Sequence, residues 1–460
     1  MTTPEVERLI ERLSDKDPSV RRSAAEALGK VGPGAQSAAK ALGKALRDEN
    51  PHVVFDAAFA LGRIGTASVP VLVESLGEKS VDMRRRALEA IRMIGHRAVD
   101  AVPAVAHQLR DTASDIRCYA AEALRKIGRA AKEAIPELML ALKDEKVDVR
   151  RAAAEALGDM GVEAVGPLCN ALKDSDPNVR FDAAFALGRI GPAASGAVPA
   201  LMDAVKDDVD SVRYIAAEAL GNIGPAAEVA VPVLTKALKD AGSEVRAAAA
   251  KSLGRIGKGA VQALISTLSD SDARVRRRAV IALGRIGPDA REAVPALTEL
   301  LEDPAVNTQA ADALRGIGPA AATAVPKLIE AMKDESGDVS RAASEALGAI
   351  GSAAVPALQK TIRGGNTHVR LRAITAFTHA GEYAGRAVNE LAECLKDDDE
   401  RVRFNAARAL EKIGGDAKPA EAALKAALQD EDEDVRYWAG EALKRIAGGS
   451  GSGSGIIPPS

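Results

Sequence analysis

Aromatic residues are scarce in this chain of 460 residues: Phe, Tyr and Trp make up 2% of it, although hydrophobic residues make up 47%. The apolar content is therefore mostly Ala, Leu, Val and Ile, and Ala and Leu are strong helix formers. Small side chains also allow helices to pack closely. The composition predicts an all-α protein with an alanine-rich interior.

Cysteines and long apolar runs are also few. Cys118, Cys169 and Cys394 are widely spaced and form no CxxC motif, which predicts reduced thiols in a cytoplasmic protein. The opening segment MTTPEVERLIERL lacks the apolar core of a signal peptide. No run of about 18 apolar residues is present that would span a membrane. We therefore expect a cytoplasmic protein without a membrane partner.

Motifs that carry catalysis are missing as well. None of the five His residues stands in metal-ligand spacing with an acid or a Cys. No GxxxxGK[ST], GxSxG or HExxH motif occurs. The net charge of −3, with 28% charged residues, indicates a mixed-sign surface rather than the overall basicity of a dedicated nucleic-acid binder. The sequence predicts a protein that is not an enzyme and has no cofactor, no metal and no catalytic residue.

What the chain does contain is one phrase repeated throughout: an aliphatic marker residue, usually followed by Arg, then an Ala-rich stretch, Leu, two residues, Ile and Gly. Successive markers are 30 to 33 residues apart, as in helical repeat proteins. The fourteen markers are Val20, Val53, Met83, Ile116, Val149, Val179, Val212, Val245, Val275, Val306, Val339, Val369, Val402 and Val435. This regularity predicts an α-solenoid of about fourteen two-helix repeats over residues 1–447.

Each phrase has the spacing of an amphipathic helix. Val179, Ala183, Leu187 and Ile190 fall on one helical face. Asp176 suits the N-cap, and Gly191 suits a left-handed residue that ends the helix. A second helix is expected after each Gly, with a Pro near its start, as in 197–205 and 230–240. Intervals of 30 residues lack three residues between the Gly and this Pro.

The phrase VRRAAAEALGDMG (149–161), joined to an AVPALxxALKD helix, resembles HEAT repeats of the phycobilisome-lyase type over residues 4–447. The resemblance implies that the marker helices line a concave face and that the Arg after the marker is structural. Val54, Asn307 and Ser340 replace that Arg, so looser junctions are expected there. The family includes scaffolds, chromophore-attachment enzymes and metal oxygenases. No His-Glu dipeptide of the iron-binding hydroxylases occurs, and no catalytic residue carries over.

The few aromatic residues are placed unevenly. Of eleven, nine lie two, three or six positions after a marker, off the face that the repeat pattern uses for packing: Phe55, Phe59, Tyr119, Phe181, Phe185, Tyr214, Phe404, Tyr437 and Trp438. Phe377 instead replaces a core Leu. Aromatics are enriched at binding hot spots. Binding is one interpretation of these positions, and gap-filling between repeats is the other.

Two further patterns add candidate binding residues. The segment FDAAFALGRIG occurs twice, at 55–65 and 181–191, and its Arg63 and Arg189 lie ten positions after the marker. Either the copies are a duplication without use or they form two equivalent pockets for one repeated ligand element. The repeats at 84–86 and at 277–285, the second of which holds Arg277, Arg278 and Arg285, have the least acidic compensation. They favour an acidic partner or a phosphate backbone, unless basic and acidic residues pair four apart along each helix.

After the repeats, residues 448–455 have the composition of a flexible Gly/Ser linker, and 456–460 form a short Pro-containing peptide with an engineered appearance. The peptide is either a remnant or a tethered ligand. Taken together, the sequence predicts a scaffold that binds a protein or extended peptide on the concave face. A bilin-lyase-like chromophore-attachment protein or chaperone, and a nucleic-acid-backbone binder, are the alternatives.

Overall fold

The computed structural model describes residues 3–334 and 337–448. These residues form α-helices and 3₁₀ helices, and no strand occurs among them. The chain divides into two compact units, Met1–Val233 and Leu234–Ser460, and the division falls inside helix α15 (Val231–Ala237). The linker predicted at 448–455 is described only at Gly448, and the peptide 456–460 lies outside the described residues.

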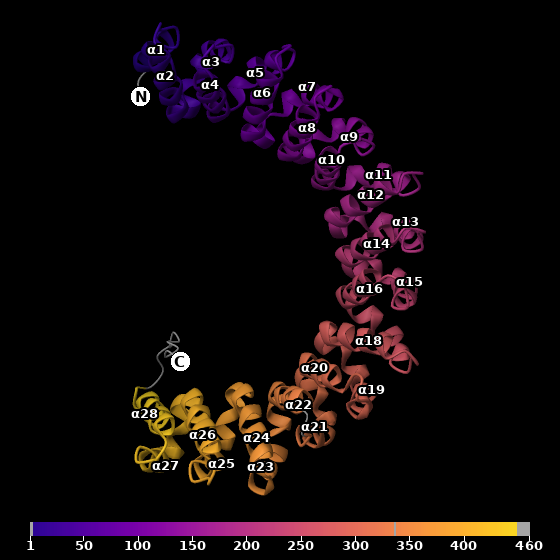
Figure 1. Cartoon of the computed structure of the whole chain (residues 1–460), viewed down its shortest axis with the longest axis vertical. Helices are drawn as coiled ribbons and strands as arrows, with labels where there is room; N and C mark the ends of the chain where they lie inside the picture. The colour runs from indigo at the N-terminus through magenta and orange to yellow at the C-terminus, as the bar shows by residue number, and fades with distance from the viewer. Residues whose placement is uncertain (1–2, 335–336, 449–460) are drawn as a thin grey trace. The chain divides into compact units, whose positions relative to one another are not determined.

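In the first unit, the marker phrases form a row of long helices, and shorter helices form a second row behind them (Figure 1). The long helices are α2 (Pro18–Val31), α4 (Pro51–Ile64), α6 (Val81–Ile94), α8 (Ser114–Ile127), α10 (Val147–Met160), α12 (Pro177–Ile190) and α14 (Asp210–Ile223). The other row is α1 (Thr3–Arg12), α3 (Ala39–Ala45), α5 (Val69–Leu76), α7 (Val102–His107), α9 (Ile135–Ala141), α11 (Val165–Ala171) and α13 (Val198–Ala204).

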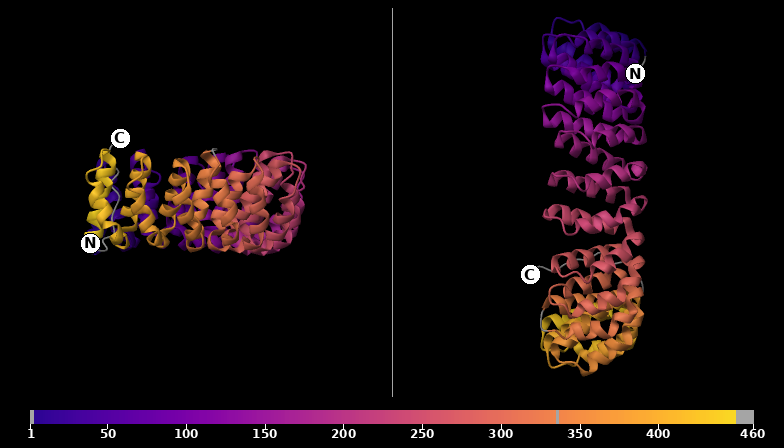
Figure 2. Two further views of the ribbon diagram at one scale, coloured as in Figure 1. Left: turned by 90° about the horizontal axis from the view of Figure 1, so that it is seen from below. Right: turned by 90° about the vertical axis from the view of Figure 1, so that its right-hand side faces the viewer.

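The second unit repeats this arrangement. Its long helices are α16 (Ser243–Ile256), α18 (Ala273–Ile286), α20 (Asn307–Ile317), α22 (Gly337–Ile350), α24 (Thr367–His379), α26 (Glu400–Ile413) and α28 (Glu433–Ala447). Its short helices are α17 (Val261–Thr267), α19 (Val294–Glu299), α21 (Val325–Met332), α23 (Val355–Gly364), α25 (Val388–Cys394) and α27 (Glu421–Ala427). Within each unit, Figures 1 and 2 show the repeats stacked as successive layers. We call the even-numbered helices the inner row, because each unit taken alone bends toward them.

Local sequence explains where an inner-row helix begins and ends. In α12 the Asp176 side chain accepts a hydrogen bond from the Asn178 backbone N–H, and Pro177 occupies the first turn. Gly191 ends the helix with φ 70° and ψ −138°, and its N–H donates to the Leu187 carbonyl. The prediction of a positive-φ glycine is confirmed. The ψ angle lies outside the left-handed helical region, in a part of φ/ψ space that is open essentially to glycine alone.

The second helix is shorter than predicted in 197–205 and 230–240, where α13 ends at Ala204 and α15 at Ala237. Residues 191–197 form a 3₁₀ helix, and only then does α13 begin, so the continuous helix expected over 197–205 is wrong at both ends. Ala194, with φ −88° and ψ 20°, breaks the helical path inside the 3₁₀ segment. Pro199 stands in the first turn of α13, where its missing N–H costs no helical hydrogen bond.

The core of each unit is the stripe that the repeat pattern predicts. Val179, Ala183 and Leu187 of α12 are at most 1% exposed, and the equivalent residues of the inner-row helices from α4 to α26 are buried in the same way. Close packing depends on small residues: a Cβ added to Gly188 would lie 3.0 Å from the Ala219 Cα of α14. Burying this stripe against neighbouring repeats stabilises helices that have too little apolar surface to be stable alone.

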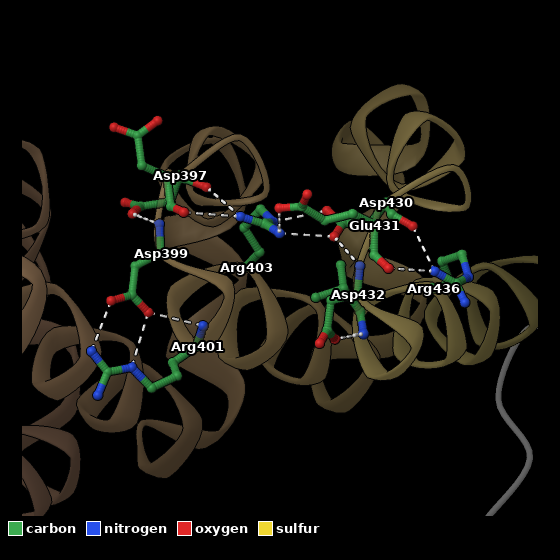
Figure 3. Close-up of polar contacts among 10 residues, drawn as sticks. Asp397, Asp399, Arg401, Arg403, Asp430, Glu431, Asp432 and Arg436 are labelled. Atoms are coloured by element: carbon green, nitrogen blue, oxygen red, sulfur yellow. Dashed lines mark hydrogen bonds and ion pairs between the residues drawn. The ribbon is translucent and has the colours of Figure 1, made fainter.

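The Arg after the marker is structural, as the family resemblance implies. Arg403 donates through Nε and Nη2 to the Asp430 carboxylate at 2.8 and 2.9 Å, and through Nη1 to the carbonyls of Asp397 and Asp398 (Figure 3). Each pair joins the first turn of one inner-row helix to the turn before the next inner-row helix. Six further pairs share the separation of 27 residues: Arg21–Asp48, Arg84–Asp111, Arg117–Asp144, Arg180–Asp207, Arg276–Asp303 and Arg370–Asp397.

The 30-residue intervals change this pairing. In three of them the acid of the turn is held by a basic residue just after the preceding short helix: Arg47–Glu78, Lys143–Asp174 and Lys239–Asp270. Arg150, which follows the marker in one such repeat, lies 3.6 Å from the Asp182 carboxylate of the next inner-row helix instead. The short spacing in the sequence thus marks a change of ion-pair partner.

Candidate functional site

The candidate site is the exposed side of the inner row, formed by residues two, three, six and ten positions after each marker. None of the nine aromatic residues predicted to lie there is buried, whereas Phe377 is 0% exposed, as expected for a core position. Phe55, Phe59 and Tyr437 are 50%, 45% and 49% exposed. The other six are half-buried: Tyr119, Phe181, Phe185, Tyr214, Phe404 and Trp438. Their binding role stays a prediction.

Helices α4 and α6 enclose a hollow on this surface that two of the exposed aromatic residues line. Its volume is about 420 Å³, and its lining includes Phe55, Phe59, Arg86, Glu89, Met93 and Lys126. The Arg86 guanidinium lies over the Phe55 ring, 5.3 Å from its centroid. Met93 is 45% exposed and packs against Gly62, where an added Cβ would lie 2.7 Å from its sulfur. The hollow therefore has an apolar floor and a basic edge.

The second copy of FDAAFALGRIG does not reproduce this hollow, so the two segments are not equivalent in structure. The residue that faces Gly188 from the next helix is Asn222, through its side-chain amide, whereas the residue that faces Gly62 is Met93. Arg189 is held by Asp159 of α10, with Nε 2.7 Å from Oδ1, whereas Arg63 forms no ion pair within residues 3–334 and 337–448. Phe181 and Phe185 are half-buried, unlike Phe55 and Phe59. The neighbouring repeats, which differ in sequence, account for the difference.

Two tyrosines of the first unit, Tyr119 and Tyr214, lie away from the hollow of α4 and α6. The Tyr214 hydroxyl donates to the Glu218 carboxylate at 3.0 Å, one turn along α14. Tyr119 lies on α8 beside Cys118 and is half-buried. Neither residue lines the hollow of α4 and α6, so the predicted site residues of this unit do not form a single pocket.

The three predicted basic residues of the second unit lie together on α18. Arg277 donates to the Ala305 carbonyl at 2.8 Å, and Arg285 is exposed and borders a hollow of about 550 Å³ between α18 and α20. Burial, and Arg246 beside it, lower the pKa of the half-buried Arg278 guanidinium. Ile281, which is 36% exposed, lies between them on the same face. An anionic group placed here would relieve the repulsion between these cations.

The remaining aromatic residues lie at the end of the second unit. Phe404 lines a hollow of about 490 Å³ together with His368, Arg372 and Asp432. Tyr437 and Trp438 make an edge-to-face pair with centroids 5.4 Å apart, and the Arg408 guanidinium lies 5.6 Å from the Trp438 centroid. Aromatic and cationic groups therefore recur together on the inner row.

Sequence reasoning missed several features of this surface. Met93 and Ile281 are exposed at positions ten and six, yet an aliphatic side chain in an amphipathic helix gives no signal of exposure. The predicted pairing of acids and bases four residues apart along a helix holds for Glu26 and Lys30, at 2.7 Å. It holds also for Arg151 and Glu155, at 4.0 Å. Glu122 and Glu155 lie in addition 3.6 Å from Arg92 and Arg125 of the preceding helix. Those arginines reach across the junction.

The three cysteine side chains are half-buried or buried. Burial raises the pKa of the Cys118 and Cys169 thiols, and that of Cys394 to about 12. No group of three or more His, Cys, Asp or Glu is placed to hold a metal ion in residues 3–334 and 337–448. Among the same residues, no helix combines the length and the apolar character needed to cross a bilayer.

Comparisons with known proteins agree with this architecture. The model of HEAT repeats matches seven overlapping segments: 6–92, 82–158, 135–221, 165–254, 231–315, 294–374 and 355–444. No curated protein sequence matches the chain. Among solved structures, importin beta is similar with a TM-score of 0.54 and 15% identity, over 97% of this chain and 74% of that one.

Kap121p is also similar, with a TM-score of 0.58 and 16% identity over 93% of this chain, which spans 56% of the Kap121p chain. The complex of Kap121p bound to Pho4p matches with a TM-score of 0.56 and 15% identity, over 94% of this chain and 57% of that one. At such identities the likeness extends to the fold. The HEAT-repeat matches together run from residue 6 to residue 444, and this chain belongs to the HEAT-repeat proteins.

Proposed function

We propose that this chain is a non-enzymatic scaffold that binds a protein or an extended peptide along its inner row. The observation that carries the proposal is the exposure of Phe55, Phe59 and Tyr437 on that row. Every exposed aromatic residue within 3–334 and 337–448 lies there, in a protein with only eleven aromatics. Large exposed apolar side chains rimmed by charge are typical of interaction surfaces.

Two other considerations support a protein partner. A repeat solenoid offers an extended surface on which contacts from several repeats add up. Kap121p, a similar solenoid, has been solved bound to Pho4p and bound to Ste12p, so a HEAT array of this kind holds protein partners in that case. Fold alone does not fix function, and the exposed aromatic residues of this chain are the more direct support.

The experiment compares two variants of the full chain in affinity capture from a cell extract. The inner-row variant carries Phe55→Ala, Phe59→Ala and Tyr437→Ala. The outer variant carries Leu140→Ala and Val162→Ala, which are 58% and 59% exposed and away from the inner-row surface. We expect the inner-row variant to lose proteins that the outer variant retains, with unchanged circular dichroism for both. Equal capture by both variants would overturn the proposal.

One alternative has a structural feature in its favour. Arg277, Arg278 and Arg285 give α18 a basic surface that suits a phosphate backbone. Binding of that kind weakens steeply with salt, by about 10³-fold between 50 and 200 mM for six phosphate contacts. Binding that stays constant over this range would favour the protein partner.

The other alternative is a lyase-like protein, which follows from the resemblance to phycobilisome-lyase repeats. It predicts a change in the visible spectrum of an added tetrapyrrole.

A further inference from the structure

The hollow between α4 and α6 has an apolar floor, and the arginines that line it have acidic partners. Phe55, Phe59 and Met93 are each 45% to 50% exposed around it. Two of the three cations that line it are already neutralised: Arg86 Nη1 lies 2.8 Å from the Glu89 carboxylate, and Arg92 lies 3.6 Å from that of Glu122. The floor is therefore suited to an apolar side chain rather than to a charged one.

Unpaired charge lies on both sides of this floor. Arg63, Met93 and Lys126 occupy the same position, ten residues after the marker, on three consecutive inner-row helices. Arg63 and Lys126 are exposed, and neither forms an ion pair within the described part of the first unit. Consecutive helices pack about 8–10 Å apart, so the axes of the helices that carry Arg63 and Lys126 are about 16–20 Å apart, with Met93 on the helix between them. An extended chain covers that span in about five or six residues.

We infer that this hollow binds an extended acidic peptide that places one large apolar side chain between two acidic residues. The apolar side chain contacts Phe55, Phe59 and Met93, and the two carboxylates pair with Arg63 and Lys126. The inference rests on the proposed function and adds the chemistry of the partner and the place where it docks. The hollow of about 420 Å³ falls within the range of about 300–1,000 Å³ usual for ligand sites.

The second copy of the same segment provides a control within the chain. Phe185 has the same neighbours in sequence as Phe59, but the adjacent repeat offers Asn222 in place of Met93. Its arginine, Arg189, is already paired with Asp159 at 2.7 Å. The inferred peptide would find neither the apolar floor nor the free cation there. Substitutions at Phe59 and Phe185 therefore separate binding at the hollow from any general effect of removing a phenylalanine.

The experiment is a selection of random nine-residue peptides, displayed on phage, against the full chain. Enriched peptides are synthesised with a fluorescent label, and their Kd is measured by anisotropy for the chain and its variants. We expect enriched peptides with a Phe, Leu, Ile or Met flanked by Asp or Glu two or three residues away on both sides. Phe59→Ala should weaken binding by about tenfold or more, as for a hot-spot residue.

Two variants and one control complete the test. Arg63→Glu and Lys126→Glu should each weaken binding, and their effect should shrink as salt rises because exposed charges are screened. Phe185→Ala should leave the Kd within about twofold of the parent value, since its surroundings lack the apolar floor. The side chains of Phe59, Arg63, Lys126 and Phe185 all lie outside the buried core. Circular dichroism checks that the helices persist in each variant.

Several results would overturn the inference. They are a selection that enriches no peptide, enriched peptides without acidic residues, or binding that Phe59→Ala leaves intact. Peptides that depend on Tyr437 instead of Phe59 would sink this inference while leaving the inner-row scaffold in place. A labelled single-stranded oligonucleotide that binds in a Phe59-dependent way where no peptide does would replace the peptide with a nucleic acid.

Discussion

Arg403 and Asp430 are joined by two side-chain hydrogen bonds, of 2.8 and 2.9 Å, across 27 residues of sequence. Their side chains are 8% and 9% exposed. Burial alone would raise the pKa of the Asp430 carboxyl, but hydrogen bonds from the Arg403 side chain and the Asp432 N–H outweigh it and hold that pKa below its usual value. The pair connects α26 to α28, and equivalent pairs connect other repeats. It stabilises the junction as long as both partners are present.

Removing one partner of this pair should loosen the last repeat. Asp430→Ala leaves the Arg403 guanidinium buried without its carboxylate, which costs about 3 kcal/mol for a buried pair. Hydrogen exchange of the α28 amides should then accelerate by about a hundredfold. Arg401→Ala is the control, because Arg401 is 67% exposed in its pair with Asp399 and solvent screens such a pair. Equal exchange in both variants would contradict a structural role for the buried pair.

Acid should weaken the same junctions. Hydrogen bonds from arginine hold the pKa of Asp48, Asp144 and Asp430 below the usual range. Because their folded pKa lies below the unfolded one, these carboxylates contribute their full stability above about pH 4 and lose it as pH falls through the folded pKa. The difference in unfolding temperature between the chain and Asp430→Asn should therefore be full at about pH 6 and close below about pH 4. A difference that persists in stronger acid, at about pH 2, would contradict the account.

Asp182 should behave in the opposite way. Burial raises its pKa to about 6, and Arg150, with its Nε 3.6 Å away, offsets this only in part. A folded pKa above the unfolded one means that stability falls as pH rises from about 4 through 6, by up to about 3 kcal/mol. Asp182→Asn should therefore unfold at a higher temperature than the parent chain at about pH 7.5, and at the same temperature at about pH 4.

The duplicated segment again supplies a control for this prediction. Asp56 occupies the position of Asp182 in the first copy, but its carboxylate lies 2.9 Å from Arg22 Nε. Asp56→Asn should remove that contact and lower the free energy of unfolding by up to about 1 kcal/mol. Two results would contradict this account: an Asp56→Asn variant that is more stable than the parent chain, or an Asp182→Asn variant that is less stable above neutral pH.

A pair of glycines tests the turn after the inner-row helix. Gly191 has φ 70° and ψ −138°, so Gly191→Ala should cost about 1–3 kcal/mol in backbone strain. Gly196, in the same 3₁₀ helix, has no positive φ, and nothing lies within 4 Å of an added Cβ. Gly196→Ala should therefore be neutral or stabilise by about 0.4–1 kcal/mol. Thermal unfolding followed by circular dichroism distinguishes them, and equal effects would rule out the proposed strain.

The fold could be predicted from the sequence where short-range chemistry determines it. Asp176, Pro177 and Gly191 mark the ends of α12 correctly, because capping and positive φ are properties of one turn. The boundaries of the short helices could not be predicted in the same way. A single residue, such as Ala194 with φ −88° and ψ 20°, leaves the helical region there, although alanine is a strong helix former.

The site could be predicted only in part, for a related reason. Position relative to the marker correctly kept all nine aromatics off the core. It did not distinguish Phe59 from Phe185, because the two lie in identical segments and differ in their neighbours from other repeats. Met93 and Asn222 are distant in sequence from those phenylalanines, and so is Asp159, which neutralises Arg189. The partners of Arg403 and its equivalents, 27 residues away, were missed for the same reason.

Hydrogen exchange of the full chain with and without a bound partner peptide is the most direct test of the central claim. If the inner row is the binding surface, the peptide should slow exchange in α4 and α6 and leave the short helices α5 and α7 behind them unchanged. Protection confined to the short helices, or no protection in either row at saturating peptide, would contradict it.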